Sequence, residues 1–159
     1  MPNTYKLVIL DLDHTVRRPL DGKTFSNGPK DQEPINQHLY KTYEGSTFVG
    51  LTNQGGVISG YRTLNSVAEE CKETLRQQPL LDRICFCPDW GDTLWHITKE
   101  GLTYSTPAKN VGGYRKPQPE GINDLMFIYE VKPEETIMFG DRSVDEMAAF
   151  RANITFNYV

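Results

Sequence analysis

Short β-rich runs alternate with segments of helical period along most of this chain, and this alternation limits the folds that it can adopt. The runs are largely apolar on both faces, as expected of strands buried in a parallel sheet. They cover residues 5–10, 47–51, 83–87, 136–139 and 154–159. Strands that alternate with helices predict an α/β fold with a doubly wound, mainly parallel sheet.

The helices are expected between these strands. Apolar residues recur at helical spacing over residues 64–75 and 122–129, and a proline follows each segment. A weaker helix is expected at Glu33–Tyr43, where Pro34 is tolerable in the first turn, and a short one at Ser143–Arg151.

Two segments break the alternation. Residues 16–27 contain an Asp-Gly turn and predict a small β-flap. Residues 89–114 alternate in polarity at 93–98 and again at 102–106, which predicts a β-hairpin insert. With no repeat, no linker and no large cap domain, the 159 residues are expected to form a single domain, 1–159.

Composition narrows the range of partners. The net charge of −4 disfavours nucleic acid and anionic membranes, although a local basic patch could still bind phosphate. No apolar run is long enough to span a bilayer, and the N-terminus carries no apolar signal segment. The three cysteines, Cys71, Cys85 and Cys87, are expected to be reduced thiols, which indicates a cytoplasmic protein. The pattern favours no particular oligomeric state.

Polar side chains follow the predicted strands at the points where the strands end. Because the carboxyl ends of parallel strands meet at one edge of a sheet, we expect these side chains to converge. They are Asp11, Asp13, Thr15, Thr52, Asn53, Gln54, Arg115, Lys116, Asp141 and Asp145. Carboxylates at this density need a hard cation such as Mg²⁺, and the lysine and threonine would then hold a phosphoryl group.

Each of these residues has an ordinary explanation when it is taken alone. Asp-x-Asp is common in turns and N-caps, Thr52 could end a strand, Lys116 could be a solvated charge, and Asp145 could cap the last helix. Their joint placement at the strand ends favours a catalytic site.

In this order, the motifs resemble those of the haloacid dehalogenase superfamily of phosphohydrolases. The segments similar to its first to fourth motifs are Asp11–Thr15, Thr52–Gln54, Lys116 and Gly140–Asp145. Residues 51–60 and 115–119 also resemble the members with minimal caps, which are the heptose bisphosphate phosphatases, the histidinol phosphatases and the phosphatase domain of polynucleotide kinases.

The resemblance implies catalytic roles for four residues. Asp11 would attack phosphorus and form an aspartyl-phosphate, which is a known route for carboxylate nucleophiles. Asp13 would protonate the leaving oxygen and then activate water. Thr52 and Lys116 would stabilise the phosphoryl oxygens.

The resemblance also implies a magnesium site. The ion would be held by Asp11, Asp141 and the backbone carbonyl of Asp13, with Asp145 in support. The cation and Lys116 would neutralise phosphate charge, so that an anion can attack an anion.

Several residues are expected to bind the substrate. Arg115 neighbours Lys116 and could grip the leaving group, while Arg17 and Arg18 on the flap could meet a second phosphate. Asn53, in the second motif, is also expected to contact the substrate. The aromatic residues of the insert would form either a mini-core or a platform beside the phosphate site; they are Trp90, Trp95 and Tyr104.

The chain departs from the resembled families at two places. His14 stands where glycine is frequent, and it is expected to be a tolerated loop side chain. The heptose bisphosphate phosphatases usually carry a zinc loop, but Cys87 alone of its four ligands is present, so no zinc is expected. Cys85 and Cys87 are expected in the core, and His96 on the surface of the hairpin.

These observations predict a Mg²⁺-dependent phosphate monoester hydrolase that acts through an aspartyl-phosphate on a small phosphorylated metabolite of the sugar-phosphate type. An open site with a small cap also fits a polynucleotide 3′-phosphatase, which the acidic composition disfavours. The third alternative is a non-catalytic phosphate-binding protein, against which the complete set of Asp11, Asp13, Lys116 and Asp141 argues.

Overall fold

The computed structural model describes residues 3–159 and has a main sheet in the strand order β7-β6-β5-β4-β1-β8-β9. These strands are β1 (Leu7–Leu10), β4 (Thr47–Asn53), β5 (Leu81–Cys87), β6 (Thr93–Thr98), β7 (Thr103–Pro107), β8 (Thr136–Gly140) and β9 (Thr155–Tyr158). Neighbours from β5 to β9 are parallel, whereas β6 and β7 join antiparallel at one edge. The expected doubly wound, mainly parallel sheet is confirmed.

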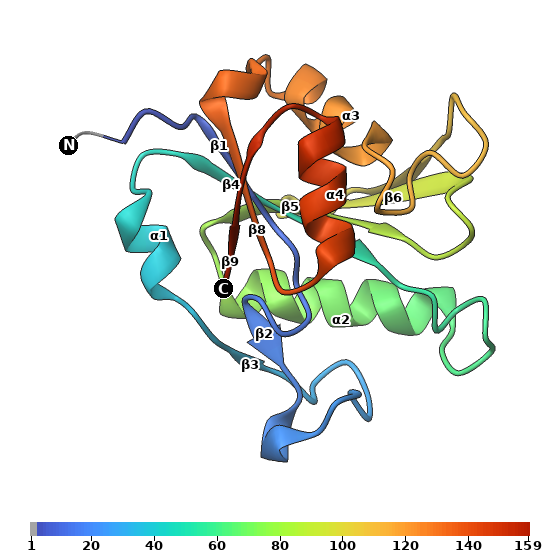
Figure 1. Ribbon diagram of the computed structural model, residues 1–159. Helices are drawn as coiled ribbons and strands as arrows, with labels where there is room; N and C mark the ends of the chain where they lie inside the picture. Colours follow the sequence, from blue (N-terminus) through green and yellow to red (C-terminus); the bar gives the residue numbers. More distant parts are fainter. Residues whose placement is uncertain (1–2) are drawn as a thin grey trace.

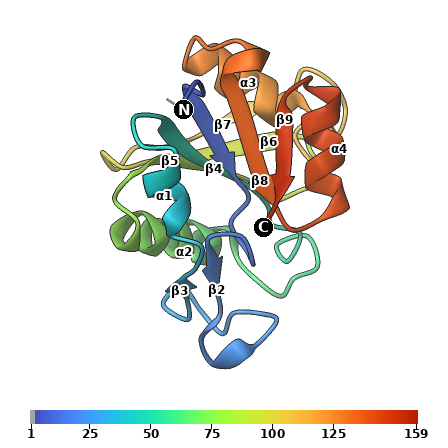
Figure 2. The same cartoon turned by 60° about the vertical axis from the view of Figure 1, so that its left-hand side comes forward.

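Helices cover both faces of this sheet, with α1 and α2 on one side and α3 and α4 on the other (Figures 1 and 2). The elements are α1 (His38–Thr42), α2 (Leu64–Gln77), α3 (Glu120–Ile128), α4 (Ser143–Arg151) and the 3₁₀ turns η1 (Leu20–Gly22) and η2 (Pro133–Glu135). Within residues 3–159, no helix combines the length and the apolar character needed to cross a membrane.

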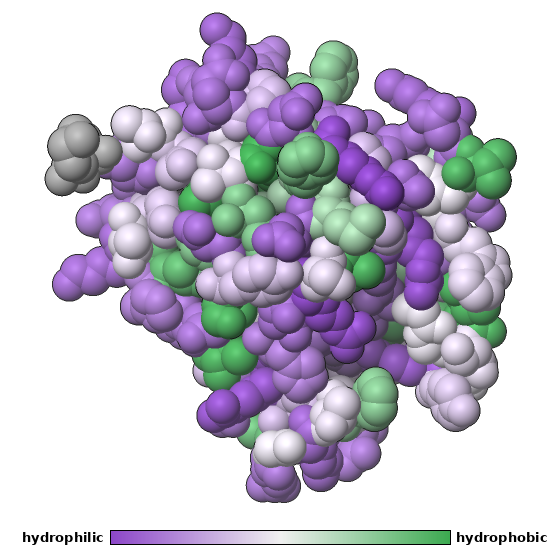
Figure 3. Space-filling model, viewed as in Figure 1, coloured by the Kyte–Doolittle hydropathy of each residue, from purple (hydrophilic) through white to green (hydrophobic). Residues whose placement is uncertain are grey.

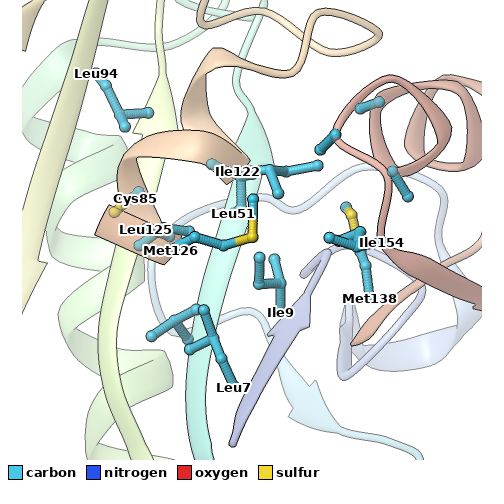
Figure 4. Packing of buried hydrophobic residues seen from close by; sticks show 14 of the residues in the cluster. Leu7, Ile9, Leu51, Cys85, Leu94, Ile122, Leu125, Met126, Met138 and Ile154 are labelled. Atoms are coloured by element: carbon cyan, nitrogen blue, oxygen red, sulfur yellow. The ribbon is translucent and has the colours of Figure 1, made fainter. Parts of the chain in front are cut away.

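The core divides into two layers because alternate residues of each strand point to opposite faces. Leu7 and Ile9 of β1 pack beneath α3 with Ile122, in the cluster of Figure 4, while Val8 and Leu10 face the other side. All four residues of β1 are fully buried. Burying each such side chain stabilises the fold by about 1.5–3 kcal/mol, which fixes the central strand that leads into Asp11. Hydrophilic side chains cover most of the surface seen in Figure 3.

The turn after β1 is anchored through Leu12, which packs onto Gly50 of β4. A Cβ atom at Gly50 would lie 2.8 Å from Leu12 Cδ2 and 3.1 Å from Ile84 Cγ1. Any larger residue would displace Leu12, and Leu12 stands between the two aspartates of the first motif. The glycine therefore sets the position of both carboxylates.

The flap differs from its prediction. Glu33–Pro34 is not the start of a helix but strand β3, which pairs antiparallel with β2 (Arg17–Arg18). Asn36 has a left-handed φ of 51°, which a right-handed helix cannot contain, so α1 begins only at His38. The two-stranded flap therefore reaches residue 34 instead of ending at residue 27.

The hairpin insert has its predicted strands but extends the main sheet. Its tip lies at the amino edge, where Lys99 N donates to Asp82 O at the start of β5 (3.1 Å). Its base lies at the carboxyl edge, where Gly91 approaches Gly112 so closely that a Cβ would lie 2.2 Å from the Gly112 oxygen. Gly91 also has a left-handed φ of 111°, so only glycine fits there. The base of the insert, not its tip, borders the strand ends.

Candidate active site

Asp11 and Lys116 form the centre of the site. Asp11 follows β1, and its backbone N–H donates to Phe139 O of β8 (3.0 Å). The ammonium group of Lys116 donates to Asp11 Oδ1 (2.9 Å) and to Leu51 O at the end of β4 (2.8 Å), and it lies 2.7 Å from Asp145 Oδ1. All three donors of this buried lysine are engaged, which fixes its position among the carboxylates.

Asp141 and Asp145 bring two further carboxylates to Asp11. Oxygen atoms of the three side chains lie within 4.8 Å of one another. Asp145 Oδ2 accepts from Arg142 N at the start of α4 (3.2 Å), and a Cβ at Gly140 would lie 2.5 Å from that oxygen. The glycine before Asp141 is thus required for Asp145 to approach the strand end.

The charge of this cluster is not balanced by the protein. Three carboxylates face one lysine, and Asp141 Oδ1 is buried without a hydrogen-bond partner in residues 3–159. Burial, opposed by Lys116 and reinforced by Asp145, raises the pKa of Asp11 to about 7. A hard divalent cation with oxygen ligands fits this donor set, because it would supply both the missing charge and a partner for Asp141.

Asp13 lies in a different environment. Arg17 Nε donates to its Oδ1 (2.8 Å), and Gln54 Nε2 donates to its Oδ2 (3.0 Å). The side chain of Asp13 is 45% exposed. The partial burial of this carboxylate would raise the pKa of Asp13, but the charge of Arg17 and the hydrogen bonds from Arg17 and Gln54 outweigh it and lower the pKa. Asp13 is therefore a carboxylate at neutral pH.

The second motif supports the site from β4. Thr52 Oγ1 accepts from Gln54 Nε2 (3.0 Å) beside Asp13. Asn53, a predicted substrate contact, instead clamps the backbone of Lys116: its Nδ2 donates to Lys116 O (3.0 Å), and its Oδ1 accepts from Lys116 N (3.1 Å). Both ends of the Asn53 amide are engaged, so its contacts are those of a residue that holds Lys116.

The predicted substrate contact of Arg17 does not fit its position. Arg17 is only 1% exposed, and its guanidinium lies between Asp13 and Glu70. The flap turns this side chain inward because Arg17 alternates with Arg18, which points outward to Glu33 (2.8 Å). Arg17 thus holds Asp13 from within.

Arg115 lies at the base of the insert, beside Lys116. Its guanidinium stands over the ring of Trp90, 5.3 Å from the centroid, and its Nη1 donates to Asp89 O (3.1 Å). Trp90 is 67% exposed, so its ring is open to solvent beside the site.

The other aromatic residues of the insert lie elsewhere, and the expected mini-core of Trp90, Trp95 and Tyr104 is wrong. Trp95 stacks on Phe86 with ring centroids 6.4 Å apart, and Tyr104 stacks on His96 at 4.6 Å. Trp95 and Tyr104 face opposite sides of the sheet because Tyr104 pairs with His96, the neighbour of Trp95, and Trp90 lies before the hairpin strands.

The surface position expected for His96 is also wrong, because the hairpin joins the sheet and buries it. His96 is 1% exposed, and its Nδ1 lies 3.2 Å from Arg83 Nη1 and 3.3 Å from Cys85 Sγ. Burial, with the charge of Arg83, lowers the pKa of His96 to about 4. Cys85 and Cys87 are buried, as expected.

His14 has a backbone φ of 62°, the left-handed conformation that glycine adopts without strain. Its Nε2 lies 3.2 Å from Thr24 O of the flap. The ring thus contacts the flap, in keeping with a tolerated loop side chain.

Three polar residues near Asp13 were not assigned a role from the sequence: Gln54, Arg62 and Glu70. Glu70 carried a readable signal, because it lies among Val67, Cys71 and Thr74 on the buried face of α2. A charged residue on a buried helix face is rare unless it is paired. Arg62 lies in a loop and carries no comparable signal.

Comparisons with known proteins agree with this geometry. A family model described as haloacid dehalogenase-like hydrolase matches residues 99–159. A structure of D,D-heptose 1,7-bisphosphate phosphatase from B. bronchiseptica, complexed with magnesium and phosphate, is 26% identical, with a TM-score of 0.66 over 95% of this chain and 78% of that chain. A comparison with curated protein sequences finds no match.

Two further structures share the fold. One, named as a HAD-like phosphatase from Mesorhizobium loti, is 21% identical, with a TM-score of 0.65 over 97% of this chain and 71% of that chain. The other, a HAD-superfamily hydrolase from Geobacter sulfurreducens, is 14% identical, with a TM-score of 0.55 over 97% of this chain and 86% of that chain. In its fold and its strand-end carboxylates, the chain is thus similar to the haloacid dehalogenase-like hydrolases, whose family model covers residues 99–159.

Proposed function

We propose that this chain is a Mg²⁺-dependent phosphate monoester hydrolase that works through an aspartyl-phosphate on Asp11. One observation carries the proposal: Asp11 lies at the strand ends, where it accepts a hydrogen bond from Lys116. Its carboxylate also has an oxygen within 4.8 Å of oxygens of Asp141 and Asp145. The resemblance to a heptose bisphosphate phosphatase crystallised with magnesium and phosphate supports it.

Asp11, Asp141 and the backbone carbonyl of Asp13 would hold the ion, with Asp145 supporting from α4. Bound Mg²⁺ would neutralise charge on the phosphoryl oxygens and orient them for in-line attack. Lys116 would add a second positive charge, and Thr52 a hydroxyl donor, at the same group.

The chain's own residues would carry the reaction in two steps. A carboxylate oxygen of Asp11 attacks phosphorus while the bond to the leaving oxygen breaks, and Asp13 gives that oxygen its proton. Asp13, now a carboxylate, takes a proton from water, whose oxygen attacks phosphorus and releases phosphate from Asp11. The lowered pKa of Asp13 suits this second step. For the first step Asp13 must carry a proton, and an approaching phosphate dianion would raise the pKa of Asp13 so that it can.

We propose a small phosphorylated metabolite of the sugar-phosphate type as the substrate. A polynucleotide needs several cations along a track, whereas Arg17 is buried and Arg18 is paired with Glu33. Arg115, beside the exposed Trp90, is the cation best placed for a leaving group or a second phosphate. One guanidinium matches a compact ligand, and the net charge of −4 disfavours a polyanion.

The test compares kcat/KM for sugar phosphates and bisphosphates with that for a 3′-phosphorylated oligonucleotide, at matched Mg²⁺ and low salt, where attraction to nucleic acid is strongest. We expect the sugar phosphates to be hydrolysed faster, and EDTA to abolish both rates. Arg115→Ala should weaken the better substrate, whereas Arg18→Ala, a matched loss of charge on the flap, should not. Preference for the oligonucleotide would instead support a polynucleotide 3′-phosphatase.

A further inference from the structure

Five side chains beside the site form a closed ring that begins and ends at Asp13. One arm runs from Asp13 Oδ1 to Arg17 Nε (2.8 Å), and Arg17 Nη2 forms an ion pair with Glu70 Oε1 (2.9 Å). The other arm runs from Asp13 Oδ2 to Gln54 Nε2 (3.0 Å), and Gln54 Oε1 accepts from Arg62 Nη1 (3.2 Å). Arg62 Nη2 closes the ring on Glu70 Oε2.

Glu70 is the point where the two arms meet. Each of its carboxylate oxygens takes one arginine, and each arginine leads to a different oxygen of Asp13. Glu70 is almost fully buried on α2, a helix of 14 residues, whereas Arg17 comes from the flap and Gln54 and Arg62 from the loop after β4. The helix therefore provides a fixed reference for segments that have little regular structure of their own.

The charges of the ring explain how it holds Arg17 and Glu70, which are buried, beside the half-exposed Asp13. Two guanidinium groups face two carboxylates, so the ring is neutral, and Arg17 is further fixed by its donation to Thr74 Oγ1 (2.9 Å). Buried charges persist when they are paired with opposite charges in this way. With both of its oxygens bound, Asp13 can turn only if the ring yields.

We propose that Glu70 is a positioning residue for the acid–base step, acting through Arg17 and through Arg62 and Gln54 to orient the Asp13 carboxylate. This inference rests on the proposed phosphatase function. It assigns Glu70 no contact with the substrate. Its consequence for kcat/KM is specific, because in the steps up to departure of the leaving group Asp13 serves only those reactions in which the leaving oxygen needs a proton.

The test is the leaving-group dependence of kcat/KM, which reports the steps up to departure of the leaving group and excludes the later attack by water. Glu70→Gln should lower kcat/KM for an alkyl phosphate by about tenfold or more, since general acid catalysis contributes about 10²–10⁴-fold. For p-nitrophenyl phosphate, whose leaving group needs little protonation, we expect a loss below about threefold, because only this acid contribution is disturbed. Asp13→Asn serves as the reference, because its ratio of kcat/KM for the alkyl phosphate to kcat/KM for p-nitrophenyl phosphate reports complete loss of the acid.

Glu69→Gln is the matched control, because Glu69 lies on the same helix but pairs with Lys72 at the surface (3.1 Å). It should leave both rates unchanged. Should Glu70→Gln fail to fold, Arg62→Gln opens the Gln54 arm alone and keeps the Arg17–Glu70 pair, and it should show the same selective loss. Equal losses for the two substrates, or no loss for either, would overturn the role of Glu70.

A crystal structure of the folded variant provides a readout that needs no activity. Asp13 should turn away from Gln54 or Arg17 in Glu70→Gln or, if that variant does not fold, away from Gln54 in Arg62→Gln, and an unmoved Asp13 would contradict the inference. If the wild type releases no phosphate from either substrate, the proposed function fails, and the structure alone still decides whether Glu70 positions Asp13.

Discussion

The two aspartates of the first motif are two residues apart, yet they belong to charge networks of opposite character. Asp11 lies in a cluster of three carboxylates and one lysine, with one buried oxygen of Asp141 left without a partner in residues 3–159. Asp13 lies in a neutral ring in which both of its oxygens are bound. The pKa of Asp11 is raised by burial, while the pKa of Asp13 is lowered, chiefly because Arg17 overcomes the effect of burial.

Around Asp13 the protein balances the charges with its own side chains, whereas around Asp11 it leaves negative charge for a ligand to balance. The ring around Asp13 needs nothing further, so its role is to fix a geometry. The cluster around Asp11 lacks positive charge, so it is stabilised by whatever cation or electrophile binds there. Three experiments can break or sharpen the comparison.

The largest expected effect is that of Asp11→Asn. The amide keeps the size of the side chain but removes the nucleophilic charge, so turnover should fall by roughly 10⁴-fold or more. Because the substitution also relieves crowded negative charge, the thermal unfolding temperature without metal should hold or rise. Phosphate release and a thermal melt measure the two effects, and substantial remaining turnover would remove Asp11 from its role.

A smaller effect is expected in the pH dependence of Mg²⁺ binding. The pKa of Asp11 in the metal-free protein is raised to about 7, so below that pH the ion must displace a proton from Asp11. The apparent affinity should therefore be nearly constant above pH 8 and fall as the pH drops below 7, approaching tenfold per unit for one displaced proton. Isothermal titration calorimetry between pH 5.5 and 8.5 measures this.

Asp11→Asn should bind Mg²⁺ more weakly, but the decrease in apparent affinity between pH 7 and pH 6 should disappear. The proton released by the ion comes from Asp11 in this scheme, and the variant has none to give. A fall that persists in the variant would place the titrating group elsewhere.

The smallest expected effect is that of zinc removal. Within residues 3–159, the one group of three or more potential ligand side chains close enough to hold a metal is Asp11, Asp141 and Asp145. At the insert, Asp89 Oδ1 accepts from Gly91 N (3.0 Å), and Glu120 Oε2 accepts from Lys109 N (2.9 Å), so carboxylates hold the loops there.

Elemental analysis after dialysis should therefore find no stoichiometric zinc, and a zinc chelator should leave the melting temperature unchanged. About one zinc per chain would show that a metal also stabilises the insert. The protein would then have a metal site outside the Asp11 cluster, which the comparison of the two networks does not predict.

The sequence predicts best those parts whose positions follow from strand ends. Asp11, Lys116, Asp141 and Asp145 converge as expected because the parallel sheet brings their segments to one edge. The roles assigned to them remain proposals. The helix expected at Glu33 failed because a weak helical pattern competes there with pairing to the flap, and pairing prevails.

Side-chain direction was harder to predict than backbone position. His96 and Arg17 were placed in the correct segments, but each faces inward instead of outward. A shift of one residue in a strand reverses the face of every side chain, and a short flap gives no periodicity from which to choose. The ring through Glu70 joins residues far apart in sequence, so local patterns alone could not reveal it.

The orientation of the hairpin insert has a practical consequence for engineering. Its tip lies at the edge of the sheet opposite to the cluster of Asp11 and Lys116, whereas the close approach of Gly91 and Gly112 secures its base. Residues 99–102 are exposed, and lengthening an exposed loop adds little entropic cost. A fluorescent reporter or an affinity tag can thus be inserted at the tip to immobilise the protein without obstructing the entry of substrates.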